Sequence, residues 1–116
     1  MNIEAIERWT DSDGYVRPAW SQEIIRHHRV YFIRAGEGGP VKVGFSTDVQ
    51  QRLRELQTAS PHQLTLEAAV MGTPAVEAWF HHELRRWHIR GEWFDLDEDR
   101  VSYALVRLFE EGLSWL

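Results

Sequence analysis

The stretch "RVYFIRAGEGGPVKVGFSTDVQQRLREL", residues 29–56, decides the fold that the sequence predicts. Two short runs rich in β-branched and aromatic residues, 30–35 and 41–45, flank the glycine-rich segment GEGGP. This pattern is typical of a β-hairpin. The segment STD then offers helix-capping side chains, and apolar residues follow at i, i+4 and i+7 from Val49. A hairpin followed by an amphipathic helix is therefore expected.

Arg52 lies beside the apolar stripe of the expected helix rather than opposite it. At about 100° per residue, Val49, Leu53 and Leu56 form the stripe and Arg52 lies at its edge. Arg54, by contrast, points to the solvent side. An arginine at the rim of a buried face often extends its aliphatic stem over apolar surface. The position of Arg52 alone therefore does not indicate a function.

The rest of the chain predicts further elements of both kinds. The run LTLEAAVM, residues 64–71, is typical of a third strand. The TP pair after it supplies the cap and the first residue of a helix expected over 74–90. A short strand over 92–96 and an amphipathic helix over 97–112 complete the pattern. We expect an α+β domain with a three-stranded antiparallel sheet flanked by helices, in the order β-β-α-β-α-α.

The length of 116 residues corresponds to one domain with a single core. Residues 1–28 lack a strong periodicity, and we expect them to form an N-terminal arm. The main domain is expected over 29–96. The helix within 97–116 is expected to pack on the same domain.

Composition excludes several classes of protein. No run of 18 apolar residues is present to span a bilayer, and the N-terminus lacks the features of a secretion signal. We therefore expect an intracellular, cytoplasmic protein without membrane contact. The chain has no cysteine, so any metal must be bound by carboxylate, imidazole or water. The net charge of −5 argues mildly against a non-specific nucleic-acid binder, although the acidic residues are concentrated at the two ends and the centre is net positive.

One carboxylate and two imidazoles share an edge of the helix expected over 74–90. Glu77, His81 and His88 lie within about 40° of one another on a helical projection. Such an edge suits a cation, with Glu77 as oxygen ligand and His81 as ligand, base or phosphate contact. A surface pair is the commoner role of Glu77 and His81, and a zinc site using His81 and His88 is a further alternative. For Glu92, in "GEWF", we expect a structural role, pairing with an arginine or capping a turn.

Together these residues resemble the GIY-YIG nucleases. The first family motif resembles Val30-Tyr31 and the second resembles Lys42-Val43-Gly44. The family's arginine, eight residues after the second glycine, corresponds to Arg52, and its metal-binding glutamate corresponds to Glu77. The segments VKVG and GEWFDL and the Glu-to-His spacing in EAWFH resemble the branch found in phage proteins and in meiotically up-regulated fungal genes. The resemblance covers residues 29–96.

The resemblance implies hydrolysis of a DNA phosphodiester bond with one divalent cation, Mg²⁺ or Mn²⁺, held by Glu77. It implies that Arg52 binds the phosphate and that Tyr31 and Lys42 position and deprotonate the attacking water, which requires one of the two to have a lowered pKa. His81 completes the expected catalytic set. The expected substrate contacts are Arg54, His62, Arg85 and His88.

Two departures from the family pattern leave a second interpretation open. Lys42 replaces the second tyrosine, as in some restriction enzymes of the superfamily. A histidine that some members carry one turn after the arginine would fall at Leu56, so its role is vacant or passes to His62 or His81. The alternative is a catalytically inactive module that binds DNA or a protein partner. A homodimer or a protein partner would supply the specificity that so small a domain lacks.

Overall fold

The structure is a computed structural model that describes residues 27–112. The arm expected over 1–28 therefore lies outside the described residues except for its last two, and so do residues 113–116. The elements in chain order are β1 (Arg29–Ala35), β2 (Val41–Ser46), α3 (Val49–Thr58), β3 (Leu64–Met71), α4 (Pro74–Glu83), a 3₁₀ turn (Arg85–Trp87), β4 (His88–Arg90), β5 (Trp93–Phe94) and α5 (Glu98–Glu110).

The strands form one antiparallel sheet in the order β3-β1-β2-β5-β4. The α+β class and the three long strands were predicted correctly. The predicted three-stranded sheet was wrong in its size, because β5 pairs with the start of β2 and β4 adds to β5. These added strands have only three and two residues, too few for an alternating pattern to show in the sequence.

The helix expected over 74–90 ends at Glu83. Thr73 caps its start with a hydrogen bond to the Ala75 N–H, as expected. At the other end the chain leaves the helical conformation at Leu84, whose side chain is fully buried, and passes through the 3₁₀ turn into β4. Pairing with β5 thus overrides the helical pattern of these residues.

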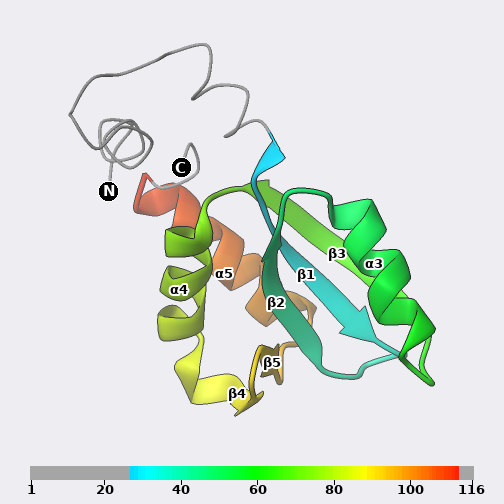
Figure 1. The fold of residues 1–116 in the computed structure, drawn as a ribbon. Helices are drawn as coiled ribbons and strands as arrows, with labels where there is room; N and C mark the ends of the chain where they lie inside the picture. The colour runs from blue at the N-terminus through cyan, green and yellow to red at the C-terminus, as the bar shows by residue number, and fades with distance from the viewer. Residues whose placement is uncertain (1–26, 113–116) are drawn as a thin grey trace.

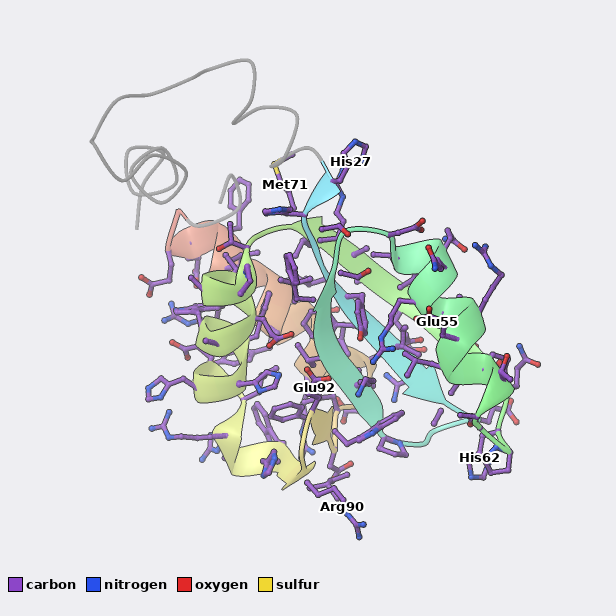
Figure 2. The ribbon with its side chains drawn as sticks, in the orientation of Figure 1. His27, Glu55, His62, Met71, Arg90 and Glu92 are labelled. Atoms are coloured by element: carbon purple, nitrogen blue, oxygen red, sulfur yellow. The ribbon has the colours of Figure 1, made fainter. Side chains whose placement is uncertain are left out.

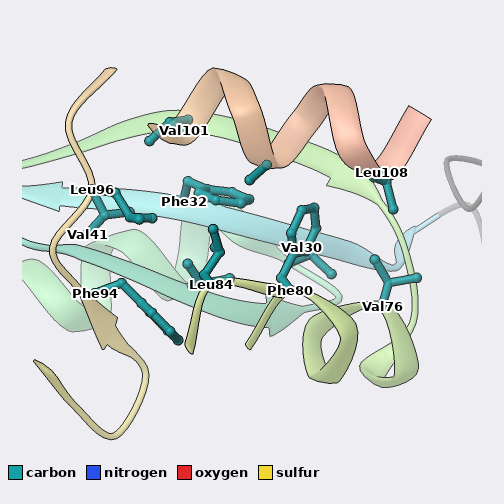
Figure 3. Close-up of a cluster of buried hydrophobic side chains, with 12 residues drawn as sticks. Val30, Phe32, Val41, Val76, Phe80, Leu84, Phe94, Leu96, Val101 and Leu108 are labelled. Carbon is teal, nitrogen blue, oxygen red and sulfur yellow. The ribbon is translucent and has the colours of Figure 1, made fainter. Parts of the chain in front are cut away.

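The two faces of the sheet carry separate helices (Figure 1). Along β1, Val30 and Phe32 face a core shared with α4 and α5, whereas Tyr31 and Ile33 face α3. The alternation follows from the two-residue period of a strand. Figure 3 shows the larger cluster, in which Leu108 of α5 and Phe80 of α4 lie on the Val30 side of the sheet. Helix α5 therefore shares the core of the strands.

Among residues 27–112, none of the helices has both the length and the apolar composition of a membrane-spanning segment.

Candidate functional site

Helix α4 covers the outer edge of β2 beyond the point where the neighbouring strand β5 ends. Strand β5 pairs only with Val41 and Lys42, so the backbone groups of the next residues need other partners. The His81 ring lies 2.8 Å from the Val43 carbonyl oxygen through Nε2, and the Phe45 N–H donates to the Glu77 carboxylate. Two side chains one turn apart on α4 are thereby fixed against the edge of β2.

The contact to Val43 also determines the tautomer of His81. A carbonyl oxygen can only accept, so Nε2 must carry the proton. In the neutral ring, Nδ1 then keeps a free lone pair. The ring packs edge-on against Phe94, which further restricts its orientation. A histidine held in this way is arranged as metal ligands usually are, with one ring nitrogen bound to a carbonyl and the other available.

Glu92 joins Glu77 and His81 in one group of possible metal ligands. Each offers a ligand atom, and these atoms all lie within 4.8 Å of one another, with all three side chains half-buried. Glu92 lies in the turn between β4 and β5, and its backbone carbonyl accepts from the Val43 N–H at 2.9 Å. Figure 2 shows Glu92 beside β2 on the side of α4. Two carboxylates and an imidazole are a donor set that fits a divalent cation.

The charge of Glu92 perturbs Glu77. Burial raises the pKa of the Glu77 carboxyl group, and repulsion from Glu92 raises it further, against smaller opposing effects of His81 and the Phe45 N–H. Two carboxylates this close disfavour each other's ionisation. A cation between them would remove that repulsion, so the electrostatics agree with the donor geometry.

Lys42 is the other partner of Glu92. Its ammonium group lies 2.9 Å from Glu92 Oε1, and its side chain is only 12% exposed. The Nζ atom also lies 5.5 Å from the centre of the Trp93 ring. A lysine on the solvent face of a strand would extend into water, whereas this one is directed toward the carboxylates.

Tyr31 and Arg52 meet on the same face of the sheet as Lys42, the face that carries α3. Tyr31 pairs with Gly44 across β1 and β2, and a Cβ atom on Gly44 would lie 2.4 Å from the Tyr31 hydroxyl oxygen. Arg52 of α3 donates a hydrogen bond to this hydroxyl. Burial raises the pKa of Tyr31 even though the bond from Arg52 opposes the shift. The position of Arg52 at the rim of the apolar stripe thus brings its guanidinium group to the buried phenol.

These groups form one network of contacts and charges. Lys42 pairs with Glu92, and the charges of Glu92 and Glu77 both act on Tyr31, the partner of Arg52. The five residues expected to be catalytic come from four elements and lie in this network. They are Tyr31, Lys42, Arg52, Glu77 and His81.

The residues expected to contact substrate lie outside this network. Arg54 is exposed on α3, and His62 is exposed in the connection that follows α3. The guanidinium of Arg85, in the 3₁₀ turn, donates to the His82 carbonyl at 2.8 Å. His88 lies in β4 rather than on the helix edge, with Nε2 2.9 Å from the Gly91 carbonyl. Because His88 is absent from the group of possible ligands among the described residues, the alternative zinc pair has no support in the fold.

From the sequence, Glu92 was expected to have a structural role, either pairing with an arginine or capping a turn. Its ion-pair partner is Lys42 instead, and it lies among the possible cation ligands. No sequence spacing connects Glu92 to Glu77, because the two meet only when the β4–β5 turn folds against β2. The sequence feature that could have drawn attention to Glu92 was its position directly after a glycine, Gly91. The φ of 53° at Gly91 marks a tight turn.

A small α+β fold that places lysine, arginine and tyrosine around paired carboxylates has the character of a nuclease-type domain. The comparisons agree: the chain belongs to the T5orf172 domain family, whose model matches residues 28–109. This family is a phage-associated domain of the nuclease type. Searches of curated proteins and of solved structures find no match.

Proposed function

We propose that this chain is a metal-dependent DNA endonuclease of the GIY-YIG type, within the branch of phage proteins and meiotically up-regulated genes. The observation that supports this most is the network in which Arg52 contacts Tyr31, Lys42 pairs with Glu92, and the charges of Glu92 and Glu77 act on Tyr31. It joins a phosphate-binding group, a phenol, an amine and carboxylates, which are the groups that phosphodiester hydrolysis requires.

Arg52 binds the scissile phosphate in this proposal. Its side chain is 42% exposed, so the guanidinium group can reach a substrate while one of its N–H groups stays on Tyr31. A guanidinium group donates several parallel hydrogen bonds to phosphate oxygens. These bonds strengthen as negative charge builds on the phosphate in the transition state.

Tyr31 and Lys42 position the attacking water. Because burial raises the pKa of Tyr31, its hydroxyl group is protonated at neutral pH. The hydroxyl oxygen accepts from Arg52, which leaves its own proton available to a water or phosphate oxygen. The Lys42 ammonium group is held by its ion pair with Glu92.

Glu77 is the expected ligand of a divalent cation, Mg²⁺ or Mn²⁺. When bound, such a cation neutralises charge on the phosphate and on the leaving oxygen. The Phe45 N–H orients the Glu77 carboxylate from the edge of β2. His81 offers a ring nitrogen to the same group of ligands.

The substrate contacts are proposed to extend from this centre along exposed cationic residues. Arg54 lies on the same helix as Arg52, and His62 follows that helix. Arg85 and His88 lie beyond the end of α4. DNA that extends across the catalytic network in both directions would contact Arg54 and His62 at one end and Arg85 and His88 at the other.

The test is cleavage of supercoiled plasmid and of a branched DNA by the purified protein with Mg²⁺ or Mn²⁺. Glu77→Ala and Arg52→Ala should each abolish cutting and retain the fold, whereas Glu98→Ala, at the exposed start of α5, should cut like the wild type. Cutting that persists in Glu77→Ala would refute the assignment of the site. DNA binding by a folded wild-type protein that never cuts would instead support the inactive binding module.

A further inference from the structure

The turn between β4 and β5 holds Glu92 against the site by its backbone as well as its side chain. The Glu92 carbonyl accepts from the Val43 N–H at 2.9 Å. The Val43 carbonyl is the group that the His81 ring contacts at 2.8 Å. One residue of β2 therefore anchors Glu92 and His81 at once, and their relative positions are set by strand geometry rather than by flexible side chains.

The ligand atoms of Glu92, Glu77 and His81 lie within 4.8 Å of one another. Atoms that bind the same Mg²⁺ or Mn²⁺ lie about 2.1 Å from it, and so about 3 to 4.2 Å from each other. Only small side-chain movements separate the observed arrangement from a closed set of donors. Each donor is also oriented by a neighbour: Lys42 for Glu92, the Phe45 N–H for Glu77 and the Val43 carbonyl for His81.

The charges at this place are unbalanced without a cation. Glu77 and Glu92 carry two negative charges when ionised, and Lys42 supplies one positive charge. A carboxylate whose only task was to pair with Lys42 would be more stable away from a second carboxylate.

We infer that Glu92 is a third protein ligand of the cation site, completing with Glu77 and His81 a set of two carboxylates and one imidazole. The inference rests on the proposed function, which assigns the cation to Glu77 alone. Three protein ligands leave about half of an octahedral shell for water and a phosphate oxygen. Glu92 also holds the Lys42 ammonium group, so one carboxylate connects the cation site to the amine.

The test measures Mn²⁺ binding directly, by calorimetric titration and by the paramagnetic resonance of free Mn²⁺, on the full chain without DNA. Glu92→Gln should weaken Mn²⁺ binding at least tenfold, as loss of a ligand does. Glu92→Asp keeps the charge but shortens the side chain, and it should weaken binding several-fold. Glu77→Gln should weaken binding at least as much as Glu92→Gln.

Two control variants separate a lost ligand from other effects. Lys42→Gln breaks the same ion pair from the other side and keeps all three ligands, so it should weaken Mn²⁺ binding much less than Glu92→Gln does. Glu55→Gln, on the exposed face of α3, removes one negative charge outside the ligand set and should leave the affinity unchanged. Thermal unfolding of each variant establishes that it is folded.

The outcomes distinguish this inference from the proposed function. If Glu92→Gln and Glu92→Asp bind Mn²⁺ like the wild type while Glu77→Gln does not, Glu92 is only the partner of Lys42 and the inference is wrong. If Lys42→Gln weakens binding as much as Glu92→Gln, the ion pair is responsible and the inference is also wrong. If the wild type itself binds no Mn²⁺, both the cation site and the proposed function fail.

Discussion

At the scale of single residues, Gly44 matters because Tyr31 lies against it. A Cβ atom at this position would lie 2.4 Å from the Tyr31 hydroxyl oxygen and 2.5 Å from the ring carbon that bears it. The ring is buried and cannot move away freely. Gly44→Ala should therefore displace the phenol from Arg52 and reduce plasmid cutting at least tenfold, with a loss of stability of about 1 to 3 kcal/mol. Cleavage rates and urea denaturation measure the two effects.

The cause can be checked with a second substitution. If the clash with Tyr31 is responsible, Gly44→Ala should cost much less stability when Tyr31 is already alanine. An equal cost in both backgrounds would mean that the backbone of β2, rather than the tyrosine, requires glycine at this position.

The raised pKa of Glu77 predicts how stability depends on pH. Its ordinary value is 4.5, and between that pH and the raised value the folded state binds more protons than the unfolded state. The free energy of unfolding therefore falls as the pH rises through this window. Glu77→Gln removes the ionisation, so in the presence of a chelator the variant should be more stable than the wild type at about pH 8, with a difference that shrinks toward about pH 4.

Urea denaturation at both pH values tests this prediction, and Mn²⁺ provides a second arm. The cation should stabilise the wild-type protein at neutral pH and stabilise Glu77→Gln much less, because the folded variant binds it more weakly. A variant that is no more stable than the wild type at either pH would contradict the raised pKa.

At the scale of elements, Arg34 joins segments that are distant in sequence. Its side chain is 9% exposed and pairs with Glu67 of β3. It also donates to the Gly39 carbonyl at 2.9 Å and to the Leu96 carbonyl at 2.7 Å. Arg34→Met keeps the aliphatic stem but leaves these acceptors without a donor, so we expect a loss of about 3 kcal/mol.

Chemical denaturation measures this loss, and Arg54→Met on exposed α3 is the matched control, expected within about 0.5 kcal/mol of the wild type. Arg34 faces away from Tyr31 across the sheet, as the alternation along β1 requires. Below its unfolding transition, Arg34→Met should therefore cut DNA at the wild-type rate. Reduced cutting by the folded variant would show that the two faces are coupled.

The elements that the sequence predicted well are those with a local signal. The hairpin of β1 and β2 has a glycine-rich turn between β-branched runs, and α3 has both a cap and an apolar stripe. Asp48 indeed caps α3, accepting from the Gln51 N–H. Strand β4 has no such signal, and the short strand predicted over 92–96 marks β5 without its partners, because both strands join the sheet only through pairing with each other and with β2.

The residues of the site divide in the same way, into those with a local signal in the sequence and those brought together only by folding. Tyr31, Lys42 and Arg52 were predicted from motif order and spacing, and in the structure Arg52, at the rim of its helix, reaches Tyr31. The closeness of Glu92 to Glu77 was not predicted, because it depends on the turn after β4, and the residues of β4 were assigned to the end of a helix. His88 was placed beside Glu77 by the same extension of α4 and lies in β4 instead.

At the scale of the whole molecule, the proposed binding of DNA to a chain of net charge −5 requires a small cationic face. Phosphate contacts release counterions, and the logarithm of the DNA association constant falls by about 0.9 per contact for each tenfold rise in salt. If Arg52, Arg54 and Arg85 are the charged contacts, the slope should be about −3. Binding should then be weak and sensitive to salt over about 50 to 200 mM.

Removing one contact should change this slope by a defined amount. In DNA-binding titrations with a chelator present to prevent cutting, Arg54→Ala and Arg85→Ala should each reduce the slope by about 1. Arg86→Ala is the matched control, since Arg86 lies over the Trp87 ring, 5.5 Å from its centre, and should leave the slope unchanged. If Arg85→Ala and Arg86→Ala show the same dependence of DNA binding on salt, Arg85 is not a phosphate contact and the DNA binds elsewhere on the protein. Because the slope counts contacts while cutting reports chemistry, Arg54→Ala should lower affinity at unchanged single-turnover rate, whereas Arg52→Ala should lower both.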